Sequence, residues 1–212
     1  MRTLAIAVLV LGLDTRAGEC QIPSTRLPWS RGDVTASVGV FSANHDVAGE
    51  PGGRDWSASL FRGLGAGFYW SDHLKTEIEA AWPGPTEAFG YFSTRLADGS
   101  STYTYDEHTF RAFTMSAGQL YHFGRNAFVH PFVGAGIDVT RERDEIERTS
   151  QTTRGSPRTD IGDTTSVRAR PFVTTGFKAY VSDRAFFRGD VKLGVGSHVE
   201  QIVWKAAFGV DF

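Results

Sequence analysis

Apolar residues recur at every second position from Asp33 to the C-terminal Phe212, and this alternation dominates the sequence. Between residues 202 and 212, the even-numbered residues are all apolar or aromatic, whereas most odd-numbered residues are small or charged. Successive residues of a β-strand point to opposite sides, so a period of two places all the apolar side chains on one face. An amphipathic helix needs a period of about 3.6 residues. The pattern therefore predicts strands that each have one apolar face.

The alternation is repeated in eight segments that are joined by tight and long connections. The tight ones lie at 71–72, 124–126 and 182–184, the long ones at 43–55, 84–103 and 141–163, and a fourth outer connection, near Ser197 to Glu200, is short. Turn signals at Asp98-Gly99 and Gly155-Ser156-Pro157 indicate that two of the long connections continue as hairpins. We therefore predict an all-β fold, an eight-stranded antiparallel up-and-down β-barrel. Its short turns and both termini would lie at one end, and its long loops at the other.

Three residues do not fit this pattern easily. Pro131 and Pro171 lie inside predicted strands, where each removes a backbone donor from the ladder. A local bulge or kink at each proline is the expected accommodation. Gln119 falls on an otherwise apolar face.

The alternation fits either a soluble, lipocalin-like barrel with an apolar interior or a transmembrane barrel with an apolar exterior. The second face of the strands is rich in glycine, for example Gly63, Gly65 and Gly67, and carries charges of both signs. Glycine weakens a strand and gains nothing on a surface, whereas inside a narrow barrel it leaves room for long side chains. Aromatic residues also cluster near the short turns, as in interfacial girdles. We therefore predict a transmembrane barrel with the apolar face toward lipid.

The lumen of such a barrel would hold the charged residues. A charge inside needs a partner of opposite sign, and an eight-stranded barrel is only about wide enough for side chains to fill it. We expect a network of ion pairs that plugs the lumen, formed by Lys75, Glu77, Glu79, Asp138, Arg168, Arg170, Lys178, Arg188, Asp190, Lys192, Lys205 and Asp211.

The chain resembles the outer-membrane β-barrel family that includes the OmpA transmembrane domain and the OmpX-like small barrels. Three stretches carry the resemblance, at residues 65–74, 131–136 and 208–212. It implies a bacterial cell outer membrane location, short periplasmic turns and long extracellular loops. The C-terminal Phe212, preceded by Phe208 and Val210 at alternate positions, resembles the signal that the barrel-assembly machinery reads.

The N-terminal residues predict secretion. Arg2 precedes an apolar run from Leu4 to Leu13, which is too short to span a bilayer as a helix, and Thr15-Arg16-Ala17 offers a cleavage site. We expect a signal peptide at 1–17, a periplasmic segment at 18–32 and the barrel domain at 33–212. A buried first strand or helix of a cytosolic protein is the alternative interpretation of the apolar run.

Few residues predict chemistry. The net charge of −2 and the absence of a basic face argue against nucleic acid, and the six histidines have no metal-site spacing. We expect no cofactor and no metal. Ser197-His198-Val199-Glu200 is the one candidate for a lipid-modifying site, but Ser197 and His198 would point to opposite faces of a strand unless a turn intervenes. A polar loop is the favoured interpretation.

Three arginines, Arg62, Arg111 and Arg141, interrupt the apolar face at the expected outer rim, about ten residues from the short turns. They either extend into water beyond the bilayer or form a collar of guanidinium groups that pairs with lipopolysaccharide phosphates.

The favoured function is that of a non-enzymatic barrel with a structural, adhesion or surface-interaction role through its long loops. Its partners would be outer-membrane lipids, lipopolysaccharide, the barrel-assembly machinery and a host or surface ligand. A narrow pore for small solutes is the first alternative, and a lipid A-modifying hydrolase or acyltransferase is the second. Ion pairs that fill the lumen favour the non-enzymatic, closed barrel.

Overall fold

The computed structural model describes residues 31–46, 54–123, 128–153 and 155–212. The expected signal peptide at 1–17, most of the segment 18–32 and the tight turn at 124–126 lie outside the described residues. Among the described residues, no helix is long and apolar enough to cross a membrane.

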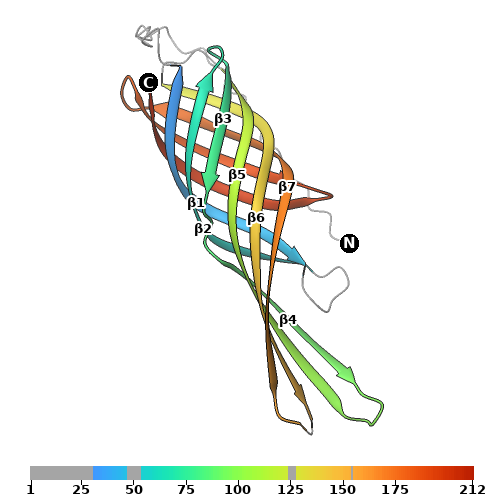
Figure 1. Ribbon diagram of the computed structural model, residues 1–212. Helices are drawn as coiled ribbons and strands as arrows, with labels where there is room; N and C mark the ends of the chain where they lie inside the picture. Colours follow the sequence, from blue (N-terminus) through green and yellow to red (C-terminus); the bar gives the residue numbers. More distant parts are fainter. Residues whose placement is uncertain (1–30, 47–53, 124–127, 154) are drawn as a thin grey trace.

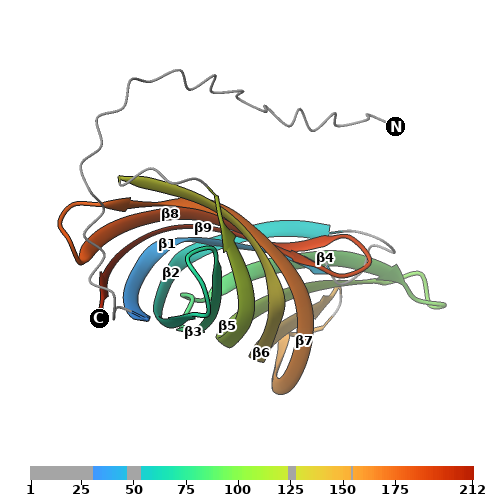
Figure 2. The same ribbon diagram turned by 90° about the horizontal axis from the view of Figure 1, so that it is seen from above.

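The described strands form a single antiparallel sheet. They are β1 (Gly32–Asp46), β2 (Arg54–Tyr69), β3 (Leu74–Ala81), β4 (Thr86–Arg95), β5 (Ser101–His122), β6 (Val129–Thr152), β7 (Arg158–Tyr180), β8 (Ala185–Val195) and β9 (Val199–Asp211). The order is β3-β2-β1-β9-β8-β7-β6-β5-β4, and an additional pairing of β3 with β5 closes the sheet into a ring (Figure 1). The ring contains eight strands, which confirms the predicted barrel, while β4 pairs with β5 outside it (Figure 2).

β4 continues β3 beyond the ring after a break at Pro83-Gly84-Pro85. Ala81 lies opposite Thr114 and Thr86 lies opposite Phe110, so five steps along β3 and β4 match four steps along β5. One extra residue on one strand is a β-bulge, which bends the strand and increases its twist. Because proline cannot donate to a ladder, the break falls where the chain leaves the ring.

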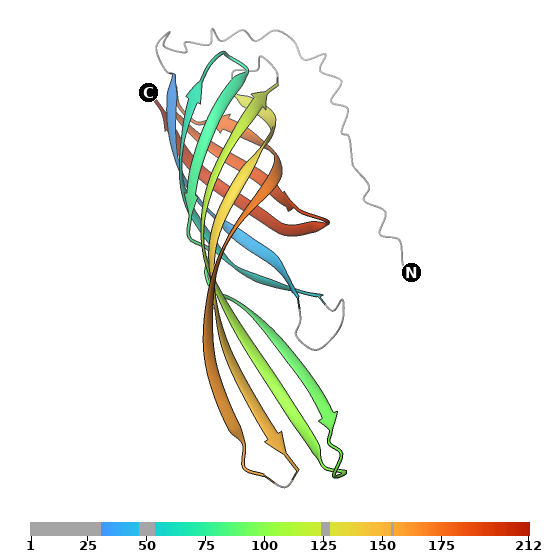
Figure 3. The ribbon, with the colours of Figure 1, turned by 45° about the vertical axis from the view of Figure 1, so that its right-hand side comes forward.

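Two long hairpins, β4–β5 and β6–β7, extend far beyond the ring at the end opposite the C-terminus (Figures 1 and 3). In the first hairpin, the backbone N–H and the hydroxyl of Ser100 donate to Oδ1 of Asp98 at 2.9 and 2.6 Å. These bonds hold the pKa of Asp98 below its usual value. Gly99 has a φ of 80°, which favours glycine. The predicted hairpins are confirmed, but most of 84–103 and 141–163 is strand rather than loop, because both ladders continue past the ring.

The two faces of the strands are oriented as predicted. The apolar face points outward, where the exposed fraction is 59% for Trp204 and 57% for Leu64. The glycine and charge face points inward, where both Lys75 and Lys178 are 2% exposed. The prediction that aromatic residues lie outside is wrong for five inward-pointing and buried phenylalanines, Phe41, Phe61, Phe132, Phe172 and Phe186.

Pro131 and Pro171 fit into their strands without the expected bulge, because the β6–β7 ladder has no register shift at either residue. The carbonyl of Pro131 accepts the N–H of Phe123 at 2.7 Å, so its backbone faces β5 just beyond the last residue of that strand. Pro171 and Val181 lie an even number of residues apart, so the backbone of Pro171 faces β8, as the N–H of Val181 does. The last β7–β8 pair is at Phe172, and Pro171 lies one residue beyond it. Each missing N–H therefore falls at the end of a ladder.

Candidate functional site

The lumen is filled by side chains from every strand of the ring. Near the short turns, Nζ of Lys178 lies 2.6 Å from Oδ1 of Asp211 and 3.4 Å from Oδ2 of Asp33. Nζ of Lys75 approaches the same Asp33 oxygen at 2.8 Å, and the Tyr69 hydroxyl donates to it at 3.0 Å. A buried charge is costly unless it is paired and hydrogen-bonded. These contacts give both carboxylates the partners that burial requires.

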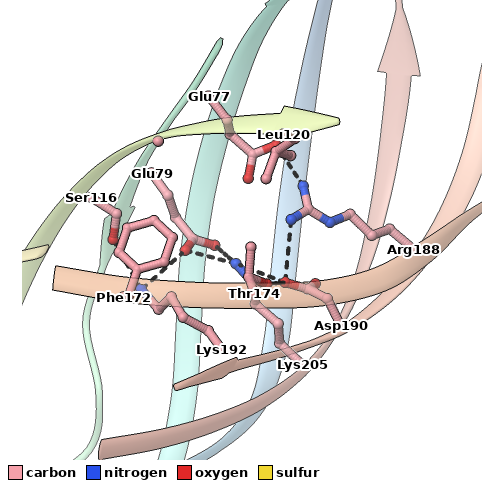
Figure 4. A pocket seen from close by; sticks show the side chains of 11 residues that line it. Glu77, Glu79, Ser116, Leu120, Phe172, Thr174, Arg188, Asp190, Lys192 and Lys205 are labelled. Carbon is pink, nitrogen blue, oxygen red and sulfur yellow. Dashed lines mark hydrogen bonds and ion pairs between the residues drawn. The ribbon is translucent and has the colours of Figure 1, made fainter. Parts of the chain in front are cut away.

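Ion pairs continue through the middle of the lumen (Figure 4). Arg188 pairs with Glu77 and, at 3.2 Å, with Oδ2 of Asp190. Nζ of Lys205 lies 3.6 Å from the same Asp190 oxygen and 2.6 Å from Oε1 of Glu79. Arg188 and Lys205 each contact two carboxylates, and Asp190 contacts both of these cations.

Lys192 on β8 connects Glu79 on β3 to Asp138 on β6. Its Nζ lies 3.9 Å from Oε2 of Glu79 and 3.0 Å from Oδ1 of Asp138, and it donates to Oγ of Ser116 at 3.0 Å. Lys75 also contacts Glu77 at 2.6 Å. The charged groups therefore form one connected series, which runs Asp211, Lys178, Asp33, Lys75, Glu77, Arg188, Asp190, Lys205, Glu79, Lys192 and Asp138.

The inward phenylalanines stand beside the cations of this series. Nζ of Lys178 lies 3.6 Å from the ring centroid of Phe186, and Cζ of Arg188 lies 4.5 Å from that of Phe132. Lys192 lies 5.0 Å from the Phe172 centroid. A cation close to a ring is attracted by the negative ring face, most strongly where both are removed from water. The rings thus stabilise the cations and fill the space between them.

Inward glycines make this packing possible. A Cβ atom at Gly67 would lie 1.9 Å from Cε of Lys75 and 2.6 Å from Oδ1 of Asp33. A Cβ atom at Gly209 would lie 2.3 Å from Cζ of Phe186. All three distances are far below van der Waals contact. Glycine is required here because a neighbouring side chain occupies the position of its missing methyl group.

An apolar cluster on β1, β2, β3 and β9 lies in the lumen on the hairpin side of the ion pairs. It consists of Phe41, Ala43, Phe61, Ala81 and Val203, all buried. Nζ of Lys205 lies 5.7 Å from the centroid of Phe61, so the cluster adjoins the ion pairs directly. The cavity among the mid-lumen charges measures about 20 Å³. That is about the space of one water molecule.

The structure brings together all the predicted lumen residues except Arg168 and Arg170. Nε of Arg170 donates to Glu200 at 2.8 Å, close to the first residue of β9. Arg168 is exposed and does not join, because it lies on the part of β7 that extends past the end of β8. Asp33 was missed, although its parity with Thr35 and Ser37 places it on the inward face of β1. Tyr69 was also left out of the predicted network, although it has the same parity as the inward Gly63, Gly65 and Gly67.

The Ser197–Glu200 segment does not assemble an acid–base–nucleophile set. Oγ of Ser197 and Nδ1 of His198 are 2.8 Å apart, because residues 196–198 form a bend between β8 and β9, which is the case that the prediction left open. Glu200 instead accepts a hydrogen bond from Arg170. Among the described residues, no cluster of His, Cys, Asp or Glu could hold a metal ion.

Two of the three rim arginines border an aromatic pair on the outer surface. The N–H of Trp82 donates to the carbonyl of Arg62 at 2.8 Å, and the Trp82 ring lies 5.6 Å from that of Phe113. Phe113 is directly opposite Arg141. Arg62, Trp82, Phe113 and Arg141 thus form one cross-strand row. Arg111 lies two residues beyond Phe113, and its guanidinium is 3.7 Å from Glu145.

Polar pairs also organise the inner face of the hairpins. Arg148 donates to both carboxylate oxygens of Asp106, at 2.8 and 2.7 Å, and the Asp106 side chain is fully buried. The hydrogen bonds that Arg148 donates to Asp106 raise the pKa of Arg148. Nδ1 of His108 lies 3.1 Å from Oδ2 of Asp144. Both contacts join β5 to β6 beyond the ring.

Several solved outer-membrane proteins are similar to this chain. Neisserial surface protein A superimposes with a TM-score of 0.54 and 14% identity, over 85% of this chain and 97% of that one. The β-barrel domain of Pseudomonas aeruginosa OprF gives 0.48 and 12%, over 84% and 97%. The attachment invasion locus protein Ail of Yersinia pestis gives 0.47 and 11%, over 86% and 99%. At these identities the likeness concerns the fold.

A search of curated proteins finds no match. The family model described as outer membrane protein beta-barrel domain matches residues 5–212, nearly the whole chain. That match and the closed ring with its apolar exterior lead to one conclusion: the chain belongs to the outer membrane β-barrel domain family and is a bacterial outer-membrane protein.

Proposed function

We propose that the protein is a non-conducting, non-enzymatic barrel that anchors two long hairpins at the cell surface for adhesion or another surface interaction. The observation that carries this proposal is the filled lumen, in which a connected series of ion pairs adjoins the apolar cluster of Phe41, Ala43, Phe61, Ala81 and Val203. A solute would have to separate buried charges and then displace the apolar cluster. Both steps are costly in a medium of low dielectric constant.

The hairpins support the surface role because they carry exposed aromatic side chains well beyond the ring. The rings of Phe89 and Tyr105 stack 6.1 Å apart, and those of Tyr91 and Tyr103 stack 6.4 Å apart. Tyr91 is 66% exposed. Exposed apolar patches on a protein surface mark sites of interaction with other molecules.

Conductance in planar bilayers tests the closed lumen. We expect no current steps from the reconstituted full chain at moderate voltage, and heat-modifiable migration of the same preparation confirms that the protein is folded. A steady ion current would overturn the closed-lumen proposal in favour of a narrow pore. Unchanged lipid A masses in cells that express the protein are expected for a non-enzyme, and a shifted mass would contradict that part.

Trimming the hairpins tests the surface role. Residues 89–107 can be replaced by Asn-Gly, because Ala88 and His108 are cross-strand partners and the ladder below stays in register. We expect bacteria that carry this variant to adhere less to host cells than bacteria with the full chain, at equal amounts of folded barrel. Equal adhesion after trimming both hairpins would contradict the surface role.

The rim arginines favour a second function, contact with lipopolysaccharide. Guanidinium groups pair bidentately with phosphate, and the row formed by Arg62, Trp82, Phe113 and Arg141 places two of them beside aromatic rings at the outer rim. We expect replacement of Arg62, Arg111 and Arg141 with Gln to reduce the lipopolysaccharide that copurifies with the barrel. Replacement of the exposed Arg158 and Arg184 is the matched control. Unchanged copurification in the rim variant would contradict this function.

The C-terminal residues supply the expected contact with the barrel-assembly machinery. Phe208 and Phe212 point outward and are 47% and 63% exposed, with Val210 between them on the same face. This alternation of outward apolar side chains at the end of the last strand supports the proposed assembly signal. We expect Phe212→Ala to slow the appearance of folded barrel in the outer membrane, measured by pulse labelling and heat-modifiable migration, and an unchanged rate would contradict the signal.

A further inference from the structure

We propose that a phospholipid of the periplasmic leaflet occupies a fixed groove on the lipid-facing surface between β3 and β8. The groove has a volume of about 560 Å³. Most of its lining residues face outward from five neighbouring strands, in two adjacent cross-strand rows, and the inward-facing Leu120, Gly134 and Thr174 complete the lining. One row contains Leu74, Tyr121, Val133, Thr175 and Val191, and the other contains Gln119, Ala135, Val173 and Leu193.

The groove runs diagonally across the apolar band. Leu74 is the first residue of β3 and directly follows the turn at the periplasmic end. Leu193, at the other end of the groove, lies only two residues before the outer end of β8. The course follows the tilt of the barrel strands, because a row perpendicular to tilted strands climbs across the bilayer. A chain of methylene groups that enters at the periplasmic interface could therefore follow the groove toward the bilayer centre.

The periplasmic end of the groove contains the polar residue that the strand pattern does not explain. The Gln119 carboxamide faces outward and donates to Oγ1 of Thr76 at 2.6 Å. The indole N–H of Trp70 donates to the same oxygen at 2.7 Å. Polar groups in lipid are costly unless they are hydrogen-bonded, and a carboxamide has two donors and an acceptor. Gln119 thus retains hydrogen-bonding capacity toward the membrane.

A phospholipid matches both ends of this groove. Its ester carbonyls accept hydrogen bonds, which the second N–H of Gln119 can donate, at the depth of the interfacial aromatic residues, where Trp70 and Tyr121 lie. Its acyl chain matches the apolar part around Ala135, Val173 and Leu193. The groove is continuous with the apolar outer band of the barrel, so an acyl chain of the surrounding bilayer can enter it from the side. Lipopolysaccharide is placed in the opposite leaflet, away from Gln119.

Native mass spectrometry of the full chain, extracted from outer membranes in a mild detergent, tests the proposal. We expect a population that retains one phospholipid. Ala135→Phe fills the middle of the groove, and Gln119→Leu removes the polar end, so both should lower the retained fraction several-fold. Ala36→Phe is the matched control, because Ala36 faces lipid on β1, on the opposite side of the ring. It should retain lipid as the unmodified chain does.

Folding of each variant is checked by heat-modifiable migration. Because Gln119 lies at the exposed surface, Gln119→Leu keeps the test valid if Ala135→Phe does not fold. Equal retention in the groove variants and the control would overturn the proposal. Retained lipopolysaccharide in place of phospholipid, or a mass of two chains that the groove variants abolish, would also overturn it in favour of another occupant.

Discussion

Asp33 and Asp211 are direct cross-strand partners at the seam where the first strand of the ring, β1, meets the last strand, β9. Two carboxylates in this position repel each other, which destabilises a strand pair. Nζ of Lys178 lies 3.4 Å from Asp33 and 2.6 Å from Asp211 and compensates both. Lys178 belongs to β7, which is separated from β9 by β8. Closure of the seam therefore depends on a side chain that reaches across the lumen.

Lys178→Met is expected to destabilise the barrel strongly, because it leaves two buried carboxylates with too little positive charge. Removal of one partner from a buried ion pair costs about 3–5 kcal/mol. Urea-induced unfolding in lipid vesicles, followed by tryptophan fluorescence, measures the change. Adding Asp211→Asn to this variant should recover a large part of the loss. If the single and double variants are equally unstable, the seam charges are not the cause.

Gly67→Ala is expected to lower the free energy of unfolding by about 1–3 kcal/mol, the usual cost of overpacking a filled interior. The new methyl group would collide with Lys75 and Asp33, which belong to the same seam cluster. Gly162→Ala is the matched control, since no atom lies within 4 Å of a Cβ at that position. Equal stability of the two variants in the same unfolding assay would contradict the packing argument.

The sequence predicted the fold well because a period of two is a local property that each strand displays by itself. It also predicted most of the lumen charges, since the alternation places a charged side chain at an inward position in the lumen. It did not predict the inward phenylalanines, because Phe186 fits only where Gly209 on the neighbouring strand leaves space. Nor did it pair Asp33 with Lys178, which is 145 residues away, because partners depend on register around the whole ring.

The hairpins were underestimated for a related reason. The polar composition of 84–103 and 141–163 resembles that of loops, yet the strands there are held by cross-strand contacts such as Asp106 with Arg148. Lipid does not cover this region, so its outward face no longer has to be apolar, and the alternation weakens. Pairing between strands continues where the hydrophobic pattern ends.

Asp106→Ala is expected to loosen the hairpins while the ring stays intact. The variant leaves Arg148, which is half-exposed, without its buried bidentate partner. Loss of a hydrogen bond to a charged group costs about 1.5–3 kcal/mol. Limited proteolysis of whole cells should therefore cleave within β4–β7 faster, with unchanged heat-modifiable migration. Asp160→Asn, at an exposed pair with Arg158, is the control and should be cleaved as the unmodified chain is.

Two different groups of side chains fill the lumen, the ion pairs and the apolar cluster, so opening it should require changes in both. Arg188→Ala removes the link between Glu77 and Asp190 and admits water among the charges, but the apolar cluster around Phe61 still blocks the path. Phe61→Ala opens the cluster, but the ion pairs below it remain. Each single variant should therefore show little current in planar bilayers. The double variant should conduct and should favour cations, because the connected series in the lumen would then contain six carboxylates and only four cations. Conduction by either single variant would show that one group alone closes the barrel, and a silent double variant that still folds would place the barrier elsewhere.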